Sequence, residues 1–497
     1  MSKKIIIIGS GISGLASGCY LQMNDYRTEI FELHDKTGGL CTAWKRKEYT
    51  FDGCIHMLIG SDPKSNFYDV WQELNTFDNI EFVYHEEFYQ IIDGDEKFTF
   101  FYNREKLRSE MLRIAPEDEK AIISFFSDLE SMSGFSLPIE KPAELFKLRD
   151  ILGMMFKQGK QMQLLRKFTK QTWGSYLKKF TNEKLRRYIS LGIPSENFVA
   201  FAGLMNIVWL KEKVAGYPLG GSLPIVRNMT SSYLKYGGKI NYNSRVVEIL
   251  VEDNKAVGIK LENGEEHHAD IIISAADGYN TIYELLKGNY ISPEIDNHYK
   301  ELEIYEPLCQ ISFGVNRKFE EIPHTIFYLL KEEITIDPKT TVDFLPIWIY
   351  NFDPTLAPEG KTVVTLFLTA RDFKFWQNLR TNDRAKYNKE KERLVNITLE
   401  ILEKLFPGIR DKVEIHDVAT PATYYRYTNN WQGCFEGWIL TPAIYNKMKR
   451  TLPGLESFYM VSQWVNPGGS LQTALLAGRN VTQIICHEDK KVFTTKQ

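Results

Sequence analysis

At 497 residues the chain is too long for one compact core, so we expect two or more domains. A hydrophobic fraction of 43% with 25% charged residues is typical of a globular protein, and a net charge of −3 gives no reason to expect nucleic acid as a partner. The six cysteines form no Cys-x-x-Cys pair, which predicts reduced thiols and no metal site. No apolar run reaches about 18 residues, and we therefore expect a cytoplasmic protein.

The first residues predict a nucleotide-binding βαβ unit. Ile5–Ile8 is a β-branched run typical of a buried parallel strand, and it leads directly into the sequence GSGISG. Gly9 permits the tight turn, Gly11 lets the backbone approach a pyrophosphate, and Gly14 lets the next helix pack closely on the strand. The N–H groups at the start of that helix favour phosphate.

A second strand, Arg27–Phe31, ends at Glu32. Glu32 lies 18 residues after Gly14, where an acidic side chain can accept hydrogen bonds from both ribose hydroxyls of a dinucleotide. The carboxylate would repel a 2′-phosphate, which argues against NADP. The pair Gly38-Gly39 follows, and a simple NAD-binding half-domain does not require it.

Residues 100–205 are mostly helical in pattern, and Lys141–Lys179 stands out by charge, with ten Lys or Arg against two acidic residues. A basic amphipathic helix can lie on an anionic membrane surface, with its apolar side chains buried and its cations at the headgroups. The segment therefore predicts either peripheral attachment to the inner face of a membrane or a helical lid whose lysines face water.

The second half of the chain predicts mostly strands. Arg245–Glu252, Ala256–Glu262 and Glu265–Ser274 predict a three-stranded meander with turns at Asp253-Asn254 and Asn263-Gly264. Further strands and one long charged helix are expected at Cys309–Val315, Thr325–Leu330, Phe344–Tyr350, Thr362–Leu368 and Asp383–Phe406. Near the end, Phe458–Val461 predicts a strand, Pro467-Gly468-Gly469 a turn and Ser470–Cys486 a helix.

Four stretches resemble the phytoene desaturase, carotenoid isomerase and retinol saturase group of FAD oxidoreductases, within the amine-oxidase-like flavoproteins. They are the region Gly9–Gly39, the segment KRKEYTFDGCIHMLIG, the YPLGG motif with the strand that follows it, and FYMVSQWVNPGGSLQTALLAGRNVTQII. They occur in the family's order along almost the whole chain. Leu40, Cys54, Met57 and Ser462-Gln463 depart from the family pattern and leave the subfamily open.

The resemblance implies an α/β fold and FAD as the cofactor. A Rossmann-like, glutathione-reductase-like FAD-binding domain (1–76, 216–289 and 441–497) is expected to interleave with a substrate domain of mixed sheet and helices (77–215 and 290–440). In such a flavoprotein the last helix would favour negative charge at the edge of the reduced flavin, whereas the alternative is a C-terminal helix with a serine cap. The residues expected at the cofactor are Gly9, Gly11, Ile12, Ser13, Gly14, Glu32, Leu33, Gly38, Gly39, Leu40, His56, Val246, Gly468, Gly469 and Leu471.

The reaction implied by the resemblance is desaturation, saturation or isomerisation of carbon–carbon bonds in a lipophilic polyene or isoprenoid, such as a carotenoid or retinoid. His56 is the one catalytic candidate, although a loop histidine bonded to backbone is the alternative, and Tyr217 would shape the substrate pocket. Because no second Gly-x-Gly-x-x-Gly occurs, the electron partner would be a quinone, a nicotinamide or a protein. Two other functions stay open: a flavin amine oxidase, and a non-catalytic isoprenoid-binding protein like the Rab GDP-dissociation inhibitors.

Overall fold

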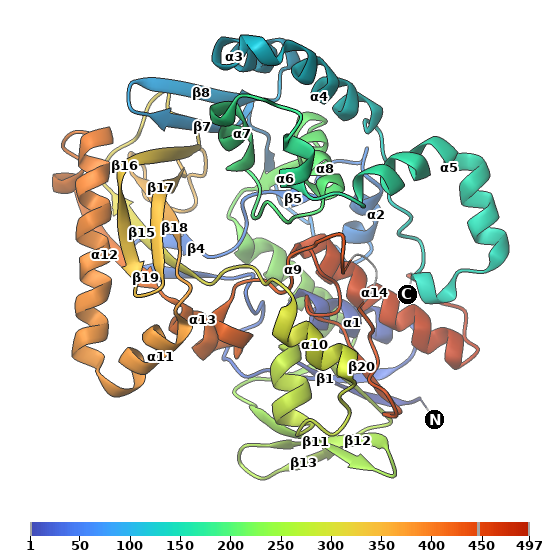
Figure 1. Ribbon diagram of the computed structural model, residues 1–497. Coiled ribbons are helices and arrows are strands. Elements are labelled where there is room, and N and C mark those ends of the chain that lie inside the picture. Colours follow the sequence, from blue (N-terminus) through green and yellow to red (C-terminus); the bar gives the residue numbers. More distant parts are fainter. Residues whose placement is uncertain (1, 445–447, 496–497) are drawn as a thin grey trace.

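The computed structural model describes residues 2–444 and 448–495, and between 148 and 160 it describes only some of the side chains. One part of the fold is built on a parallel five-stranded sheet in the order β10-β2-β1-β14-β20, of which β1 and β20 are labelled in the lower half of Figure 1. These strands come from distant parts of the chain: β1 Lys4–Ile8, β2 Arg27–Phe31, β10 Lys239–Asn241, β14 Ile271–Ser274 and β20 Phe458–Met460. The predicted α/β fold class is confirmed.

Both faces of this sheet are covered, which explains the unbroken run of isoleucines in β1. Ile5 and Ile7 pack in one core with the helices α1 (Ile12–Met23), α9 (Ser222–Lys235) and α14 (Leu471–Glu488). Ile6 and Ile8 point the other way, into a second core with the small antiparallel sheet β11-β12-β13. A strand buried on both sides needs no polar alternation.

The predicted three-stranded meander is confirmed, but its third strand is shorter than predicted. Strands β11 (Val246–Glu252) and β12 (Lys255–Leu261) pair, but the segment predicted as Glu265–Ser274 splits into β13 (Glu266–His268) and β14. The three isoleucines of β14 are buried on both faces, so this part joins the parallel sheet between β1 and β20. Asp270 fixes the break because its carboxylate accepts a hydrogen bond from the Lys4 N–H at 2.7 Å.

A second sheet of seven strands has the order β19-β15-β18-β17-β16-β7-β8 and is antiparallel except between β16 and β7. Helices α11 (Phe373–Asn382) and α12 (Arg384–Leu405) cover one face, at the left of Figure 1. Ile347 and Ile349 pack under these helices, whereas Pro346 and Trp348 alternate to the opposite face and line a cavity. The strands are β7 Glu87–Asp93, β8 Glu96–Phe101, β15 Leu308–Val315, β16 Thr325–Asp337, β17 Thr340–Ile349, β18 Thr362–Thr369 and β19 Val413–Ala419.

The region 100–205 is helical, as predicted, and closes the other side of the cavity. Its helices are α3 Arg104–Ile114, α4 Glu119–Ser131, α5 Leu148–Phe168, α6 Trp173–Leu177, α7 Glu183–Ser190 and α8 Ala200–Lys211. The remaining short elements are β3 Ala43–Arg46, β4 Tyr49–Asp52, β5 Leu58–Ile59, α2 Asn66–Gln72, β6 Phe82–Val83, β9 Ala215–Pro218, α10 Pro293–Glu301 and α13 Pro421–Thr428.

Helix α5 lies at the right edge of Figure 1 and carries most of the basic segment. The predicted amphipathic face depends on side chains that lie outside the described ones, among them Met154, Lys157 and Lys160. Three described cations of the segment are held by the protein itself: Lys141 contacts the Asp150 carboxylate at 2.6 Å, and Lys167 and Lys179 contact the Asp128 carboxylate at 3.1 and 2.9 Å. None of the described helices combines the length and apolar composition needed to cross a bilayer.

Helices α1 and α14 cross so closely that the contact needs a glycine. A Cβ on Gly478 would lie 2.5 Å from the Ser17 backbone nitrogen and 2.8 Å from the Ala16 Cβ. We therefore expect Gly478→Ala to lower the free energy of unfolding by about 1–3 kcal/mol, although alanine favours helices. Gly159→Ala is the matched control, since its Cβ would meet nothing within 4 Å. Denaturant unfolding measures the free energy of unfolding of both variants. An unchanged free energy of unfolding in Gly478→Ala would contradict the close contact between α1 and α14.

Candidate active site

A cavity of about 800 Å³ lies between the parallel sheet and the seven-stranded sheet. One end is bordered by the loops that follow β1, β2, β14 and β20, together with the first turn of α14. The carboxyl ends of parallel strands are where α/β sheets bind ligands. The other end is bordered by α8 and by the strands β7, β16, β17 and β18.

The glycine-rich loop has the geometry that a pyrophosphate requires. Gly9 has φ +94°, and its N–H donates to the Phe31 carbonyl at 2.8 Å. A Cβ on Gly14 would meet the Gly9 carbonyl oxygen at 2.1 Å, so helix and strand are in close contact there. A Cβ on Gly11 would meet nothing nearer than 4.0 Å, because this position faces the open cavity.

Glu32 is buried at the end of β2 and already accepts hydrogen bonds within the protein. Its Oε2 accepts from the Ser10 N–H at 2.7 Å and the Ser10 hydroxyl at 2.5 Å, and its Oε1 accepts from the His34 N–H at 2.8 Å. Three of the roughly four acceptor positions of the carboxylate are thus used. A ribose at this site would compete with the Ser10 hydroxyl.

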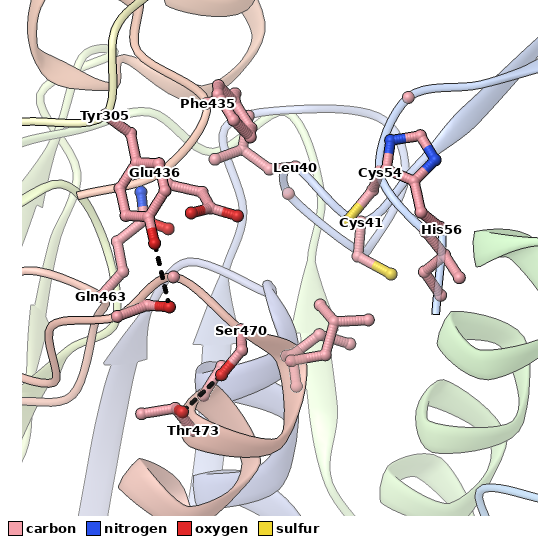
Figure 2. A pocket seen from close by; sticks show the side chains of 18 of the residues that line it. Leu40, Cys41, Cys54, His56, Tyr305, Phe435, Glu436, Gln463, Ser470 and Thr473 are labelled. Atoms are coloured by element: carbon pink, nitrogen blue, oxygen red, sulfur yellow. Dashed lines mark hydrogen bonds between the residues drawn. The ribbon is translucent and has the colours of Figure 1, made fainter. Parts of the chain in front are cut away.

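Two helices begin at the cavity without a side-chain cap. The N-cap of α1 is Gly11, which has no side chain to offer. The N-cap of α14 is Ser470, whose hydroxyl pairs with that of Thr473 at 2.5 Å instead of capping the backbone (Figure 2). The first N–H groups of both helices and their positive ends therefore face the cavity, where anionic groups are favoured.

The second glycine pair lies against the first loop. The Gly38 N–H donates to the Ser10 carbonyl at 3.0 Å, and a Cβ on Gly39 would lie 3.4 Å from the Gly11 Cα. Together with the two helix ends, this arrangement fits FAD, since backbone donors can meet a pyrophosphate at α1 and the flavin edge at α14.

The structure brings the predicted site residues together, with one exception. Gly14 lies behind the cavity wall, at the contact between helix and strand. The predicted residues that line the cavity are Gly9, Gly11, Ile12, Ser13, Glu32, Leu33, Gly38, Gly39, Leu40, His56, Tyr217, Val246, Gly468, Gly469 and Leu471. Their roles at a cofactor or substrate stay predictions.

His56 sits in an aromatic setting on the cavity wall. Its ring stacks on Trp348 with centroids 4.7 Å apart and meets Phe367 edge-on at 5.1 Å. The His56 side chain is exposed to the cavity but lies inside the protein, and desolvation there, with a smaller contribution from the charge of His324, lowers its pKa to about 4. The imidazole is therefore neutral at neutral pH.

Tyr217 also lines the cavity, but its hydroxyl is already engaged. It donates to the Asp353 carboxylate at 2.9 Å, and the Gly220 N–H donates to the same oxygen at 2.8 Å. The tyrosine thus presents its ring, not a free hydroxyl, to the cavity.

Glu436 is a site residue that sequence reasoning missed, because a single glutamate between Phe435 and Gly437 forms no motif. Its Oε2 is buried without a hydrogen-bond partner among the described residues, and a Cβ on Gly469 would meet that oxygen at 1.8 Å. Burial raises the pKa of Glu436 well above its ordinary value, and the Tyr305 hydroxyl beside it reverses this only in part. Figure 2 shows Glu436 and Tyr305 on one wall, across from His56. The sequence signal was an acid inside an aromatic stretch, CFEGW.

The far end of the cavity is an aromatic chamber. Two imidazoles stand in its wall, His85 and His324, stacked with centroids 3.6 Å apart and planes 7° apart. Two positive charges at this distance would repel one another. The other rings of the chamber are Phe88, Tyr89, Tyr102, Phe198, Phe201, Phe327, Phe344, Phe352, Phe367, Trp209, Trp348 and Tyr350.

The histidine pair predicts a specific sensitivity to acid. Burial, and then the charge of His324, lower the pKa of His85 from 6.5 to about 3. The neutral ring therefore stabilises the fold above pH 6.5, and this contribution is lost as the pH falls from 6.5 toward 3. We expect the melting temperature to fall less between pH 7 and pH 4 in His85→Phe than in the wild type. His268→Phe, at an exposed position of β13, should keep the wild-type pH dependence. An equal fall of the melting temperature in all three proteins would contradict the conclusion that His85 causes the sensitivity to acid.

Comparison with known proteins places the chain among flavoproteins. Residues 12–486 match the family model described as flavin containing amine oxidoreductase. Prolycopene isomerase 1, chloroplastic, of an Oncidium hybrid cultivar is 27% identical over 465 residues, covering 86% of this chain and 74% of that protein. Phytoene desaturase (neurosporene-forming) of Cereibacter sphaeroides is 26% identical over 455 residues, covering 87% and 85%.

The solved structures agree on the fold. Cyclohexylamine oxidase from Brevibacterium oxydans IH-35A has a TM-score of 0.60 at 12% identity, covering 99% of this chain and 100% of that one. At this identity the likeness concerns the fold alone.

Proposed function

The chain belongs to the family of flavin-containing amine oxidoreductases, and we propose that it uses FAD to change carbon–carbon bonds in a lipophilic polyene or isoprenoid. The observation that carries this proposal is the aromatic chamber, which continues directly from the glycine-lined end of the same cavity. Flat rings favour an extended, conjugated hydrocarbon. Relatives named as a prolycopene isomerase and a phytoene desaturase support the same substrate class.

The binding of FAD is assigned to segments 1–76, 216–289 and 441–497, and that of the substrate to 77–215 and 290–440. Gly9, Gly11 and the first turn of α1 would hold the pyrophosphate, and Glu32 the ribose. Gly468, Gly469 and the first turn of α14 would lie at the flavin. The other predicted lining residues would complete the contact with the cofactor.

Gly11→Val tests the cofactor assignment with little risk to the fold. Gly11 has φ −66°, which any residue adopts, and its Cβ would point into open space. We expect a folded protein that loses FAD, seen as the loss of the flavin absorbance bands that the wild type shows after purification. The melting temperature of the FAD-stripped proteins is the control for folding. Full FAD content in the variant would contradict the placement of the pyrophosphate.

When bound, FAD supplies hydride exchange with a carbon atom of the substrate. The aromatic chamber orients the polyene and keeps water out, and the neutral His56 ring belongs to this wall. Adding or removing hydrogen at a carbon–carbon bond also moves a proton, and we assign that proton to Glu436. Its raised pKa lets the carboxyl group hold a proton near neutral pH and donate it in the apolar site.

Glu436→Gln should separate chemistry from cofactor binding. The amide has the same shape but cannot exchange the proton, so we expect turnover of a carotenoid or retinoid to fall by about 10²–10⁴-fold with FAD content unchanged. Anaerobic incubation with polyenes, followed by chromatography of double-bond isomers and of saturated or desaturated products, measures this. Glu359→Gln, in an exposed turn, is the control. Wild-type turnover in Glu436→Gln would remove this carboxyl group from the mechanism.

A flavin amine oxidase is the alternative on the same scaffold. Its charged amine substrate would have to leave water for a chamber of aromatic rings. This transfer costs free energy unless an acidic side chain pairs with the amine. Hydrogen peroxide release from amines, without conversion of any polyene, would favour this alternative. A non-catalytic isoprenoid-binding role is disfavoured by the backbone donors that α1 and α14 present to the cavity.

The electron partner is proposed to be a quinone, a nicotinamide or a protein that reaches the flavin without a nucleotide domain of its own in this chain. Peripheral contact of 141–179 with a membrane would bring lipophilic substrates and quinones to the cavity. Both proposals rest on the sequence pattern and on the chemistry of the substrate.

A further inference from the structure

Two cysteines that are 13 positions apart in the chain face one another across a hairpin. Strands β3 and β4 pair from Arg46↔Tyr49 to Ala43↔Asp52, and the Gly53 N–H continues the ladder by donating to the Thr42 carbonyl at 2.9 Å. Continued by one further step beyond the paired residues, this register would set Cys41 opposite Cys54. Residues opposite one another in such a ladder have Cα atoms about 4.5–5.5 Å apart. That separation lies within the roughly 4.4–6.8 Å that a disulfide spans.

The two side chains interact as free thiols. Interaction with the neighbouring Cys41 thiol, followed by burial, raises the pKa of the Cys54 thiol well above its ordinary value. Figure 2 shows the Cys41 and Cys54 side chains on the cavity wall opposite Glu436. The two thiols are therefore neighbours on the same part of the cavity wall.

The pair is fixed to the elements assigned to the cofactor. The Cys41 N–H donates to the Gly38 carbonyl at 3.0 Å, and Gly38 in turn donates to Ser10 of the glycine-rich loop. On the other strand, the Cys54 N–H donates to the Asp52 carboxylate at 2.9 Å. That carboxylate accepts from the Ser222 N–H at 2.6 Å, at the start of α9. Both cysteines line the cavity, whereas the other four, Cys19, Cys309, Cys434 and Cys486, do not.

We infer that Cys41 and Cys54 form a redox-active dithiol that exchanges an electron pair with the flavin bound in the same cavity. The step balances: two S–H bonds break, one S–S bond forms, and two electrons and two protons pass to the oxidised flavin. In the reverse direction, the disulfide takes two electrons and two protons from the reduced flavin. The inference rests on the proposed use of FAD and adds a second two-electron store to the site.

Formation of the disulfide is tested first, and it does not require the flavin. Trypsin cuts at Lys45, Arg46 and Lys47, so Cys41 and Cys54 fall in separate peptides, 37–45 and 48–64. After mild oxidation with oxidised glutathione and alkylation of free thiols, we expect these peptides to be joined in mass spectra, and to separate on reduction. Cys54→Ser and Cys41→Ser should abolish the joined pair, and Cys309→Ala should retain it. Absence of the joined peptides in the oxidised wild type would overturn the inference.

Electron exchange is tested by anaerobic reductive titration of the oxidised holoprotein. Wild type and Cys309→Ala should consume about four electron equivalents per flavin, and Cys54→Ser and Cys41→Ser about two. A joined peptide pair with uptake of only two equivalents would show a disulfide that does not communicate with the flavin, and would overturn the exchange. A colourless protein that takes up no FAD would overturn the proposed function, and with it the exchange, even if the peptides join. Because Cys54 is only partly buried, we expect Cys54→Ser to fold, and this variant still tests both the joined peptides and the electron uptake if Cys41→Ser does not fold.

Discussion

The close approach of α1 to β1 through Gly9 and Gly14 is the contact on which the site depends. With the Gly14 Cα this near the Gly9 carbonyl, the first turn of α1 points its free N–H groups into the cavity. The same helix then meets α14 at Gly478, and this crossing brings a second uncapped helix end to the same place. Three glycines without side chains thus aim two positive helix ends at one cavity.

The two ends of the cavity differ in polarity. Backbone donors at the glycine-rich end suit a charged cofactor, and rings from α8 and the seven-stranded sheet suit a hydrocarbon. Desolvation favours the neutral form of the ionisable groups at the boundary, because it lowers the pKa of His56 and raises the pKa of Glu436. In a dry site a neutral acid can deliver a proton, whereas an unpaired ion would be costly to bury.

A buried carboxylate joins the two distant segments that build one wall. Asp52 accepts hydrogen bonds from the backbone of Cys54 and Ile55, and from both the N–H and the hydroxyl of Ser222. These four donors compensate for the loss of water around the carboxylate. They also hold the end of the β3–β4 hairpin against the start of α9, which keeps the thiol pair and His56 in place beside the cofactor end.

The sequence by itself determined the elements whose signal is local. The isoleucine run, the spaced glycines and Glu32 predicted β1, α1 and β2, and the turn glycines before Ser470 predicted α14. Periodicity of this kind reports which side chains are buried, and so it also identified β15, β16, β17 and β18 of the second sheet, whereas β7, β8 and β19 were not predicted. Most residues expected at the cofactor line the cavity for the same reason, since a glycine loop at the end of a parallel strand can face only one edge of the sheet.

Only the tertiary structure decided which partners meet. Ile271–Ser274 has the same apolar run whether it closes a meander or lies between β1 and β20, and pairing with β1 settled its place. Glu436 looked ordinary until folding buried it against Gly469, and Cys41 and Cys54 became a pair only through the register of a hairpin. Burial and proximity arise from contacts between distant segments, which one-dimensional spacing does not encode.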